Sequence, residues 1–322
     1  MADPIDIVLI RHGESESNVS GRWQGQGDSP LSPRGREQAE ALAARLAGES
    51  ADVLLASDLQ RARDTGAAVA ARLGATLTTA KEWREIDVGR WEGLTRDEVA
   101  ERFPEEIARL GRGEMVPIGG GESWADLAVR AEKALQALRR DLAPGQRAFV
   151  FCHGGVIAAL LTRLFALPLR RPRRLGNVTN TGVTTLRFEG ETPRLLQYND
   201  TLHLGPVGKW GEERRQAGAA VLALMADEQA PAGYTPTEQA YTLGRDEGAH
   251  HDDPLEAIGE LARRHGGERV TLRGEGDALR ELVHRILARP VTVGPAGVTH
   301  VVASERGHTL ADFNCADLPP RG

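Results

Sequence analysis

The stretch VLIRHGESESN, residues 8–18, places a histidine directly after a run of apolar residues. A histidine in such a position, here His12, can be a packed core residue, a metal ligand, a general base or a nucleophile. A second histidine, His153, follows the apolar run RAFVFC. Two arginines accompany them, Arg11 beside His12 and Arg61 within SDLQRARDT. Because guanidinium groups match the oxygens of a phosphate, the role of the histidines depends on whether these side chains meet.

Strands and helices alternate over the first two-thirds of the sequence. Short apolar runs predict strands at residues 5–10, 51–57, 75–79, 147–152, 181–188 and 194–199. Helical spacing of apolar residues predicts helices at 32–46, 59–73, 122–142 and 156–165, and Ser32-Pro33 supplies an N-cap and a first-turn proline. This alternation predicts an α/β fold, a three-layer sandwich in which helices cover both faces of a mostly parallel sheet.

Four of the predicted strands are followed by polar or charged residues. These are Arg11-His12-Gly13, Ser57 with Arg61, Glu85 within WREIDVGRWEG, and His153-Gly154-Gly155. Ligands of open α/β sheets bind in the crevice outside the carboxyl ends of the strands. We therefore expect two arginines, two histidines and a carboxylic acid to converge on one crevice.

Five motifs occur in order over residues 5 to about 204: RHGESESN, WQGQGDSPLSPRGREQA, SDLQRARDTG, EIDVGRWEG and FCHGG. Together they resemble the histidine phosphatase superfamily, in its phosphoglycerate-mutase-like branch. The resemblance implies a phosphohistidine mechanism that uses neither a metal nor a cofactor. His12 is then the nucleophile, which must be neutral to attack phosphorus, and Arg11 and Arg61 bind the phosphate and disfavour protonation of His12.

The same resemblance assigns roles to other residues of the predicted crevice. His153 is expected to donate a hydrogen bond, as the cation, to a non-bridging phosphate oxygen. Gly13 is expected to let the backbone come close to the phosphoryl group. Further candidates are Asn18 as an additional donor, Gln24 and Gly25 at the pocket mouth, and Ser57 in the pocket.

Glu85 is the candidate general acid, because an alkoxide leaving group needs a proton. A bound phosphate dianion is expected to raise the pKa of this carboxyl, and the same group can then deprotonate the water that hydrolyses phosphohistidine. Three other carboxylates lie nearby in sequence and are alternatives for this role: Glu82, Asp87 and Glu92.

The segment around Trp23 favours a phosphatase over a mutase. Mutases of this branch usually carry Thr-Gly-Trp after the asparagine of the first motif, whereas this chain has WQGQGD and resembles the broad phosphatases. We expect a phosphomonoesterase that hydrolyses small phosphorylated metabolites. A mutase-type phosphoryl transfer is the alternative, and a non-catalytic protein that binds phosphorylated ligands is a third hypothesis.

The composition excludes several other classes. The net charge is −6, which argues against a nucleic-acid binder. The two cysteines, Cys152 and Cys315, are too few for a disulfide framework or a thiolate metal site. Neither a signal peptide nor a membrane-spanning run is evident, so we expect a cytoplasmic protein, with a homodimer as a possible assembly.

The chain is predicted to have three parts. Residues 1–204 form the catalytic domain, 205–253 a helix and linker, and 254–322 a small α/β segment. The spacing between Glu212 and Met225 predicts an amphipathic helix in the second part. Residues 230–254 are rich in Pro, Gly, Asp and His and predict a linker or irregular arm.

The last part repeats a pattern of the first. GQRAFVFCHGG and the residues up to 169 align without a gap with GERVTLRGEGD and the residues up to 291. A little further on, TGVTTL (181–186) resembles AGVTHV (296–301) and QYN (197–199) resembles DFN (312–314). Order and spacing favour a decayed partial duplication of the second half of the catalytic domain. Glu275 stands where His153 stands, so this segment is expected to be non-catalytic.

Overall fold

The structure is a computed structural model of the 322-residue chain. It describes residues 3–167, 174–205, 209–226, 240–242, 253–287, 298–304 and 307–312. Contacts divide the chain into two compact units, one of residues 1–169 with 188–190 and one of residues 170–187 with 191–320. None of the helices in the described ranges combines the length and the apolar character needed to cross a membrane.

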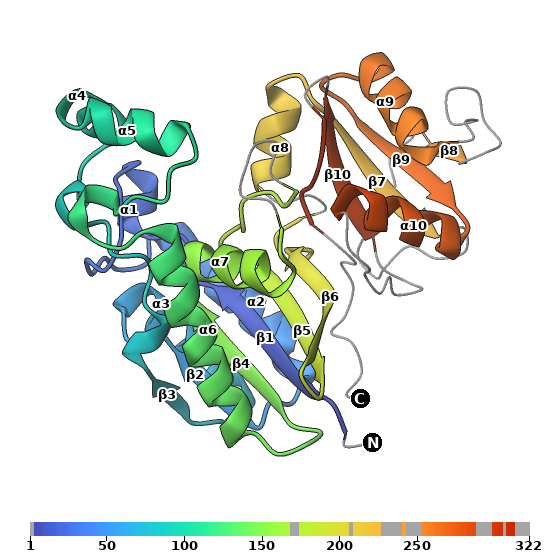
Figure 1. Ribbon diagram of the computed structural model, residues 1–322. Helices are drawn as coiled ribbons and strands as arrows, with labels where there is room; N and C mark the ends of the chain where they lie inside the picture. Colours follow the sequence, from blue (N-terminus) through green and yellow to red (C-terminus); the bar gives the residue numbers. More distant parts are fainter. Residues whose placement is uncertain are drawn as a thin grey trace. The chain divides into compact units, whose positions relative to one another are not determined.

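A six-stranded sheet carries the N-terminal part of the chain (Figure 1). Its strands are β1 (Ile5–Arg11), β2 (Val53–Ala56), β3 (Leu77–Thr79), β4 (Arg147–Cys152), β5 (Val183–Glu189) and β6 (Thr192–Asp200). Their order is β3-β2-β4-β1-β5-β6. The first four in this order pair in parallel, and the register sets Arg11 opposite Cys152 and Ala56 opposite Phe151. The carboxyl ends of β1, β2 and β4 therefore lie side by side.

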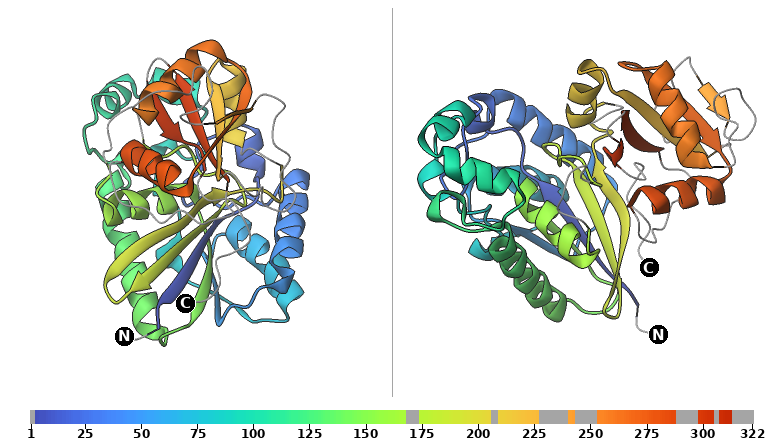
Figure 2. Two further views of the ribbon diagram at one scale, coloured as in Figure 1. Left: turned by 90° about the vertical axis from the view of Figure 1, so that its right-hand side faces the viewer. Right: turned by 45° about the horizontal axis from the view of Figure 1, so that its top comes forward.

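Helices cover both faces of this sheet, as Figures 1 and 2 show. Helices α2 (Pro33–Arg45) and α3 (Gln60–Leu73) pack together on one face, and α6 (Trp124–Asp141) and α7 (Gly154–Leu164) on the other. Strands β1 and β4 lie between the layers and bury nearly every side chain, which explains why their sequences are continuous apolar runs. The predicted three-layer α/β sandwich is confirmed.

Short elements connect these layers. They are α1 (Glu16–Val19), α4 (Arg96–Arg102), α5 (Pro104–Gly111) and the 3-10 turns η1 (Leu46–Gly48), η2 (Lys81–Trp83), η3 (Gly89–Trp91) and η4 (Ile118–Gly120). Side-chain caps define several helix starts, among them Ser32 for α2, Thr95 for α4 and Ser123 for α6. Between η2 and η3 the chain runs without regular structure, and this stretch contains Glu85.

A second sheet of five strands follows. Its strands are β7 (Ala220–Ala226), β8 (Ala240–Thr242), β9 (Arg269–Gly274), β10 (Val298–Ser304) and β11 (Gly307–Leu310), in the order β11-β10-β7-β9-β8. Helices α8 (Lys209–Gln216), α9 (Pro254–Arg264) and α10 (Gly276–Leu287) belong to the same part of the chain. A small α/β segment at the C-terminal end is thus present.

The predicted helix from Glu212 to Met225 is wrong in its second half. Helix α8 ends at Gln216, Gly218 has a φ of +89°, and the chain then enters β7. Strand β7 is the middle strand of the second sheet, and it is apolar on both faces because both are covered. A short continuous apolar run does not distinguish such a strand from a buried helix. The predicted linker likewise contains a strand, β8.

The order of the strands is the same in the two sheets when corresponding strands are compared. β2-β4-β1-β5-β6 in the first sheet matches β8-β9-β7-β10-β11 in the second. Strand β4 pairs in parallel with β1 and β2, and β9 pairs in parallel with β7 and β8. The alignment of GQRAFVFCHGG with GERVTLRGEGD sets β4 on β9 over their full lengths, and α7 and α10 begin at aligned glycines. The similarity therefore extends beyond the half-domain seen in the sequence.

Candidate active site

The predicted site residues lie at neighbouring strand ends. His12 follows β1, His153 follows β4, Ser57 follows β2, and Arg61 lies in the first turn of α3. Because β1 and β4 are adjacent and parallel, the two histidines come together, with ring centroids 5.1 Å apart and ring planes inclined by 59°.

His12 is held as a neutral imidazole with one defined tautomer. Its Nδ1 lies 2.6 Å from the carbonyl oxygen of Gly13. A carbonyl only accepts hydrogen bonds, so Nδ1 carries the proton and Nε2 keeps its lone pair. Burial, together with the charges of Arg61 and Arg11, lowers the pKa of His12 well below its usual value. The ring is 3 % exposed, and its nitrogen nucleophile is available at neutral pH.

Gly13 is required by packing against another glycine. A Cβ at Gly13 would lie 2.5 Å from the carbonyl oxygen of Gly35, in helix α2. Gly13 also donates its N–H to Thr65 Oγ1 at 3.0 Å, and Thr65 donates to the carbonyl oxygen of Arg61 at 2.7 Å. Packing thus gives this position its own need for glycine, and the expected close approach of its backbone to the phosphoryl group stays a prediction. Thr65 was missed, although it stands one helical turn after Arg61.

Arg61 is fixed by two backbone carbonyls. Its Nη1 donates to Gly27 at 2.9 Å and its Nη2 donates to Gly25 at 2.9 Å. Glu92 holds the same loop from the other side, since its carboxylate accepts from the N–H groups of Gly25 and Gly27. Burial lowers the pKa of Arg61 to about 10, which leaves the guanidinium charged at neutral pH. Gly25 thus serves the site through its carbonyl oxygen.

His153 is the N-cap residue of α7 and is completely buried. Its Nε2 lies 2.9 Å from Ser57 Oγ, so Ser57 orients the ring. Burial, then Arg61, His12 and Arg11, lower the pKa of His153 well below its usual value. The expected cationic form is therefore disfavoured by these surroundings. A bound phosphate dianion acts in the opposite direction.

Arg11 lies against the first turn of α7. A Cβ at Gly154 would contact the Arg11 side chain at 3.4 Å. Burial lowers the pKa of Arg11, and the nearby carboxylate of Glu85 opposes that shift. The N-terminal end of α7 carries the partial positive charge of the helix dipole. Arg11, Arg61 and this helix end together make a positively charged site that suits an anion.

Glu85 reaches the same helix end. Its Oε2 accepts from the N–H of Gly155 at 3.0 Å, and its Oε1 accepts from the N–H of Ile86 at 2.9 Å. A Cβ at Gly155 would lie 2.1 Å from Glu85 Oε1, so only glycine leaves room for the carboxyl. The expected convergence of two arginines, two histidines and a carboxylic acid is present.

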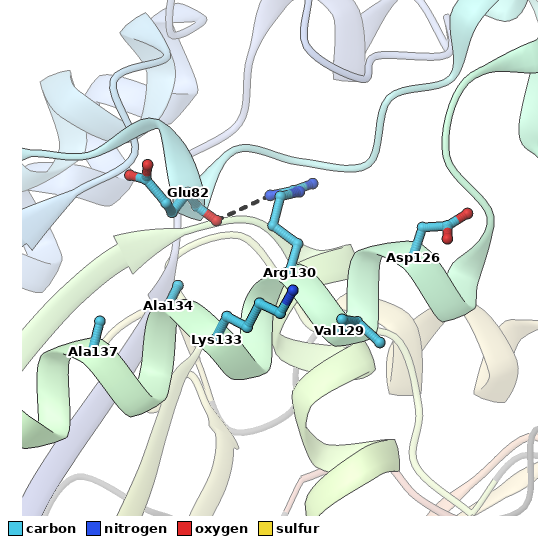
Figure 3. A pocket seen from close by; sticks show the side chains of 7 residues that line it. All are labelled: Glu82, Asp126, Val129, Arg130, Lys133, Ala134 and Ala137. Carbon is cyan, nitrogen blue, oxygen red and sulfur yellow. Dashed lines mark hydrogen bonds between the residues drawn. The ribbon is translucent and has the colours of Figure 1, made fainter.

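The other three carboxylates have different contacts. Glu92 binds the loop amides of Gly25 and Gly27, and Asp87 accepts from the N–H of Gly89 at 2.8 Å. Glu82 lines a surface cavity beside α6, as Figure 3 shows. Glu85 is the carboxylate that bonds to the first turn of α7, which favours it over its neighbours as the acid.

Asn18 and Gln24 meet at Ser15, beside α1. Asn18 Oδ1 accepts from the N–H of Ser15 at 3.2 Å and completes a capping box, while Gln24 Oε1 accepts from Ser15 Oγ at 2.8 Å. In both amides the oxygen is used within the protein, so only the nitrogen end can donate to an anion. Their roles in the pocket stay predictions.

Cys152, next to His153, is not a competing nucleophile. It is completely buried, and burial raises the pKa of its thiol. Among the described residues, no group of three His, Cys, Asp or Glu side chains is arranged to hold a metal ion.

The geometry matches a known family. The family model of the histidine phosphatase superfamily (branch 1) matches residues 7–201, which include all of these site residues. The chain belongs to the histidine phosphatase superfamily.

Several members of the superfamily resemble it at about one-third identity. A metal-independent phosphoserine phosphatase of Arabidopsis thaliana is 33% identical over 207 residues, 63% of this chain and 84% of that protein. Phosphoglycerate mutase-like protein 4 of the same plant is 34% identical over 213 residues, 64% of this chain and 90% of that protein. The solved structure of a mycobacterial glucosyl-3-phosphoglycerate phosphatase in complex with VO3 matches with a TM-score of 0.56 and 34% identity, over 61% of this chain and 99% of that one. Family and relatives support phosphatase activity.

Proposed function

We propose that the protein is a phosphomonoesterase that hydrolyses small phosphorylated metabolites through a phosphohistidine on His12, with Glu85 as general acid and base. The observation that carries the proposal is the state of His12. Its Nδ1 is committed to the Gly13 carbonyl, its pKa is lowered by burial and two arginines, and its Nε2 therefore carries the lone pair that a nucleophile needs. Nothing in this mechanism requires a metal or a cofactor.

In the first transfer, His12 Nε2 forms a bond to phosphorus as the bond from phosphorus to the ester oxygen breaks. Protonated Glu85 gives its proton to that oxygen, so the alcohol leaves neutral. Arg11, Arg61, His153 and the first turn of α7 stabilise the charge on the non-bridging oxygens. The hydrogen bond from Nδ1 to Gly13 stabilises the positive charge that the ring acquires.

In the second transfer, water attacks phosphohistidine and Glu85, now ionised, accepts a proton from that water. The bond from phosphorus to Nε2 breaks, and its electron pair returns to the imidazole. Inorganic phosphate leaves, and both His12 and Glu85 regain their starting protonation states.

A panel of phosphorylated metabolites tests the function directly. Purified protein should release inorganic phosphate from small phosphate esters, retain this activity in EDTA, and be inhibited by vanadate, which mimics the trigonal-bipyramidal transition state. Phosphoserine and phosphorylated glyceric acid derivatives belong in the panel because relatives are named for such substrates. Strong inhibition by EDTA would point to a different mechanism.

A mutase is the second candidate because one relative is named phosphoglycerate mutase-like. A mutase must keep water away from its phosphohistidine, whereas a phosphatase must admit it. Supplying 3-phosphoglycerate with a bisphosphate primer distinguishes the two. Isomerisation that is much faster than the hydrolysis of any ester would replace the phosphatase proposal.

We also propose that the domain boundary lies near residue 204 and that the chain after it is a non-catalytic duplicate of the catalytic fold. The match to the family model ends at residue 201. The common strand order of the two sheets supports the duplication.

A further inference from the structure

One arginine holds the backbone on both sides of the Glu85 side chain. Arg130, on α6, uses all five of its N–H groups. Nε donates to Glu122 Oε1 at 2.7 Å. Nη1 donates to the carbonyl oxygens of Glu82 at 3.0 Å and Arg84 at 2.8 Å. Nη2 donates to the carbonyl oxygen of Glu85 at 3.1 Å and to Glu122 Oε2 at 2.7 Å.

Glu122 binds the other end of the loop, and Arg130 and Glu122 together are called the brace below. Its Oε2 also accepts from the N–H of Asp87 at 2.9 Å, and its own N–H donates to the carbonyl oxygen of Asp87 at 2.8 Å. Burial raises the pKa of Glu122, but the bonds from Arg130 and Asp87 outweigh it and leave the pKa lowered. The carboxylate of Glu122 therefore stays ionised in its pair with Arg130 at neutral pH.

We propose that Arg130, together with Glu122, is a positioning residue that holds Glu85 within reach of the leaving-group oxygen. This inference rests on the proposed role of Glu85 as general acid. Arg130 binds three carbonyl oxygens of the loop and does not need to contact the substrate. A displacement of about 1 Å in a catalytic group can lower a rate by about 100-fold. Fixing the loop to the rigid helix α6 prevents such a displacement.

The geometry requires arginine in particular. A lysine ammonium has three N–H groups around a single point, so it cannot serve three carbonyls and both oxygens of a carboxylate. Arg130→Lys therefore keeps the charge but loses the brace. Glu122→Gln keeps Arg130 and its effect on the pKa of His153, while it removes the bidentate ion pair.

The surroundings of Arg130 allow these substitutions. Its side chain is 23 % exposed and points from α6 to the backbone of Glu82, beside a surface cavity of about 460 Å³ (Figure 3). Lys133 and Asp126 line the same cavity. A shorter side chain admits water to the cavity and leaves no void in the core, so we expect Arg130→Met to fold.

The test compares two esters with different leaving groups. An alkyl phosphate such as phosphoserine needs a proton on its departing oxygen, whereas 4-nitrophenyl phosphate releases a stable anion. The ratio kcat/KM reports only the steps up to release of the alcohol. Arg130→Met, Arg130→Lys and Glu122→Gln should each lower kcat/KM for the alkyl ester by roughly 10- to 100-fold and change it little for the nitrophenyl ester.

Two reference variants make the result interpretable. Glu85→Gln should show the same selectivity with a larger effect. Arg139→Met is the matched control, since Arg139 lies on the same helix, donates to the Gly190 carbonyl oxygen at 2.7 Å and stacks on Phe188. That variant should lower kcat/KM for neither the alkyl ester nor the nitrophenyl ester.

Failure of the inference and failure of the proposed function look different. If Glu85→Gln is selective but the brace variants affect both esters equally, or neither, Arg130 does not position the acid. If Glu85→Gln itself shows no selectivity, the general acid has been assigned wrongly. Should Arg130→Met not fold, Glu122→Gln and Arg130→Lys decide the question.

Discussion

The two sheets of this chain place corresponding strands in the same order but end them in different residues. In the first sheet, β1 ends in Arg11 and is followed by His12, while β4 is followed by His153. The corresponding strand β7 ends in Ala226, and β9 is followed by Glu275. His153 is completely buried, whereas Glu275 is exposed. A carboxylate at this position repels phosphate, so the second sheet cannot bind it in the same way.

A buried pair of polar side chains at each sheet shows that the fold requires buried polar groups to be hydrogen-bonded. Thr185 donates to Gln197 Oε1 at 3.0 Å between β5 and β6. At the aligned positions, His300 and Asp312 lie 2.8 Å apart and are buried. Both members of the pair differ between the sheets, yet each pair is satisfied, because a buried polar group without a partner is costly. Packing and satisfied hydrogen bonds persist where the phosphate-binding residues do not.

The largest expected effect on activity comes from removing His12, the nucleophile that follows β1. His12→Ala removes the nucleophile and should lower kcat by roughly 10⁴-fold or more. Brief exposure of the native protein to substrate should leave an acid-labile, base-stable phosphate that the variant lacks. Glu275→Ala, a change at the strand end of the second sheet that aligns with His153, should leave both readouts unchanged. Phosphate bound covalently to the His12→Ala protein would place the nucleophile elsewhere.

A smaller effect is expected where α7 and α10 begin. Gly155→Ala sets a methyl group against Glu85, so kcat/KM for an alkyl phosphate should fall by about 100-fold. In the second sheet the aligned residue is Asp277, which is exposed, and Asp277→Ala should have no effect on the same ratio. Native activity in Gly155→Ala would show that the loop carrying Glu85 can move without cost.

The strand ends of the first sheet could be predicted from sequence because each follows a short apolar run. Parallel pairing then brings the ends together, so His12 and His153 were placed correctly. The contacts that hold the site could not be predicted in this way. Glu92 and Arg130 act on backbone atoms of residues distant in the chain, and backbone partners leave no pattern in the side chains. The packing of Gly13 against the backbone of Gly35 could not be predicted from the sequence for the same reason.

The second unit was harder to predict because its strand β7 has no alternation. Each residue of the run from Ala220 to Met225 is buried, and such a run satisfies a helix and a strand equally. The repeat itself was visible in the sequence only from Gly267 onward, which includes β9 (Arg269–Gly274) but neither β7 nor β8. The correspondence of β7 with β1 depends on strand order, which a single sequence does not contain.

A difference in pH dependence should also distinguish the units. His12 and His153 have pKa values lowered by burial and by arginines. Below the ordinary value of 6.5 the unfolded chain binds protons that the native site refuses, so acidification favours unfolding. Each histidine contributes a slope of up to about 1.4 kcal/mol per pH unit between 6.5 and its lowered native pKa.

Thermal unfolding followed by tryptophan fluorescence measures this slope. Four of the five tryptophans lie before residue 205, so the signal reports mainly on the first unit. Tm should fall as the pH drops below 6.5, and the fall should be shallower when His12 and His153 are both replaced by asparagine. An equal slope in the double variant would assign the acid sensitivity to other groups.

The smallest effect on activity is expected from the largest change in the chain. Three hydrogen bonds join residues 174, 176 and 199 to residues 310 and 311, at the end of β11 and directly after it. Leu310 donates its N–H to Arg174 at 3.0 Å, Gly176 donates to Leu310 at 2.7 Å, and Asn199 Nδ2 donates to the Ala311 carbonyl oxygen at 2.9 Å. Each is worth about 1 kcal/mol net. A protein ending at Leu204 loses them, together with the contact of Leu202 with Met225 and Val298, so its Tm should fall.

Its chemistry should remain, because every residue assigned to phosphate transfer lies between Arg11 and Gly155. The solved relative matches 61% of this chain while 99% of its own length is covered, so that relative folds without a counterpart of the remaining residues. Phosphohistidine formation and nitrophenyl phosphate hydrolysis by the shortened protein, measured below its Tm, should therefore match the full chain. If the shortened protein is folded by circular dichroism but inert, the residues after Leu204 supply something catalytic, and the two sheets differ less in function than their strand ends indicate.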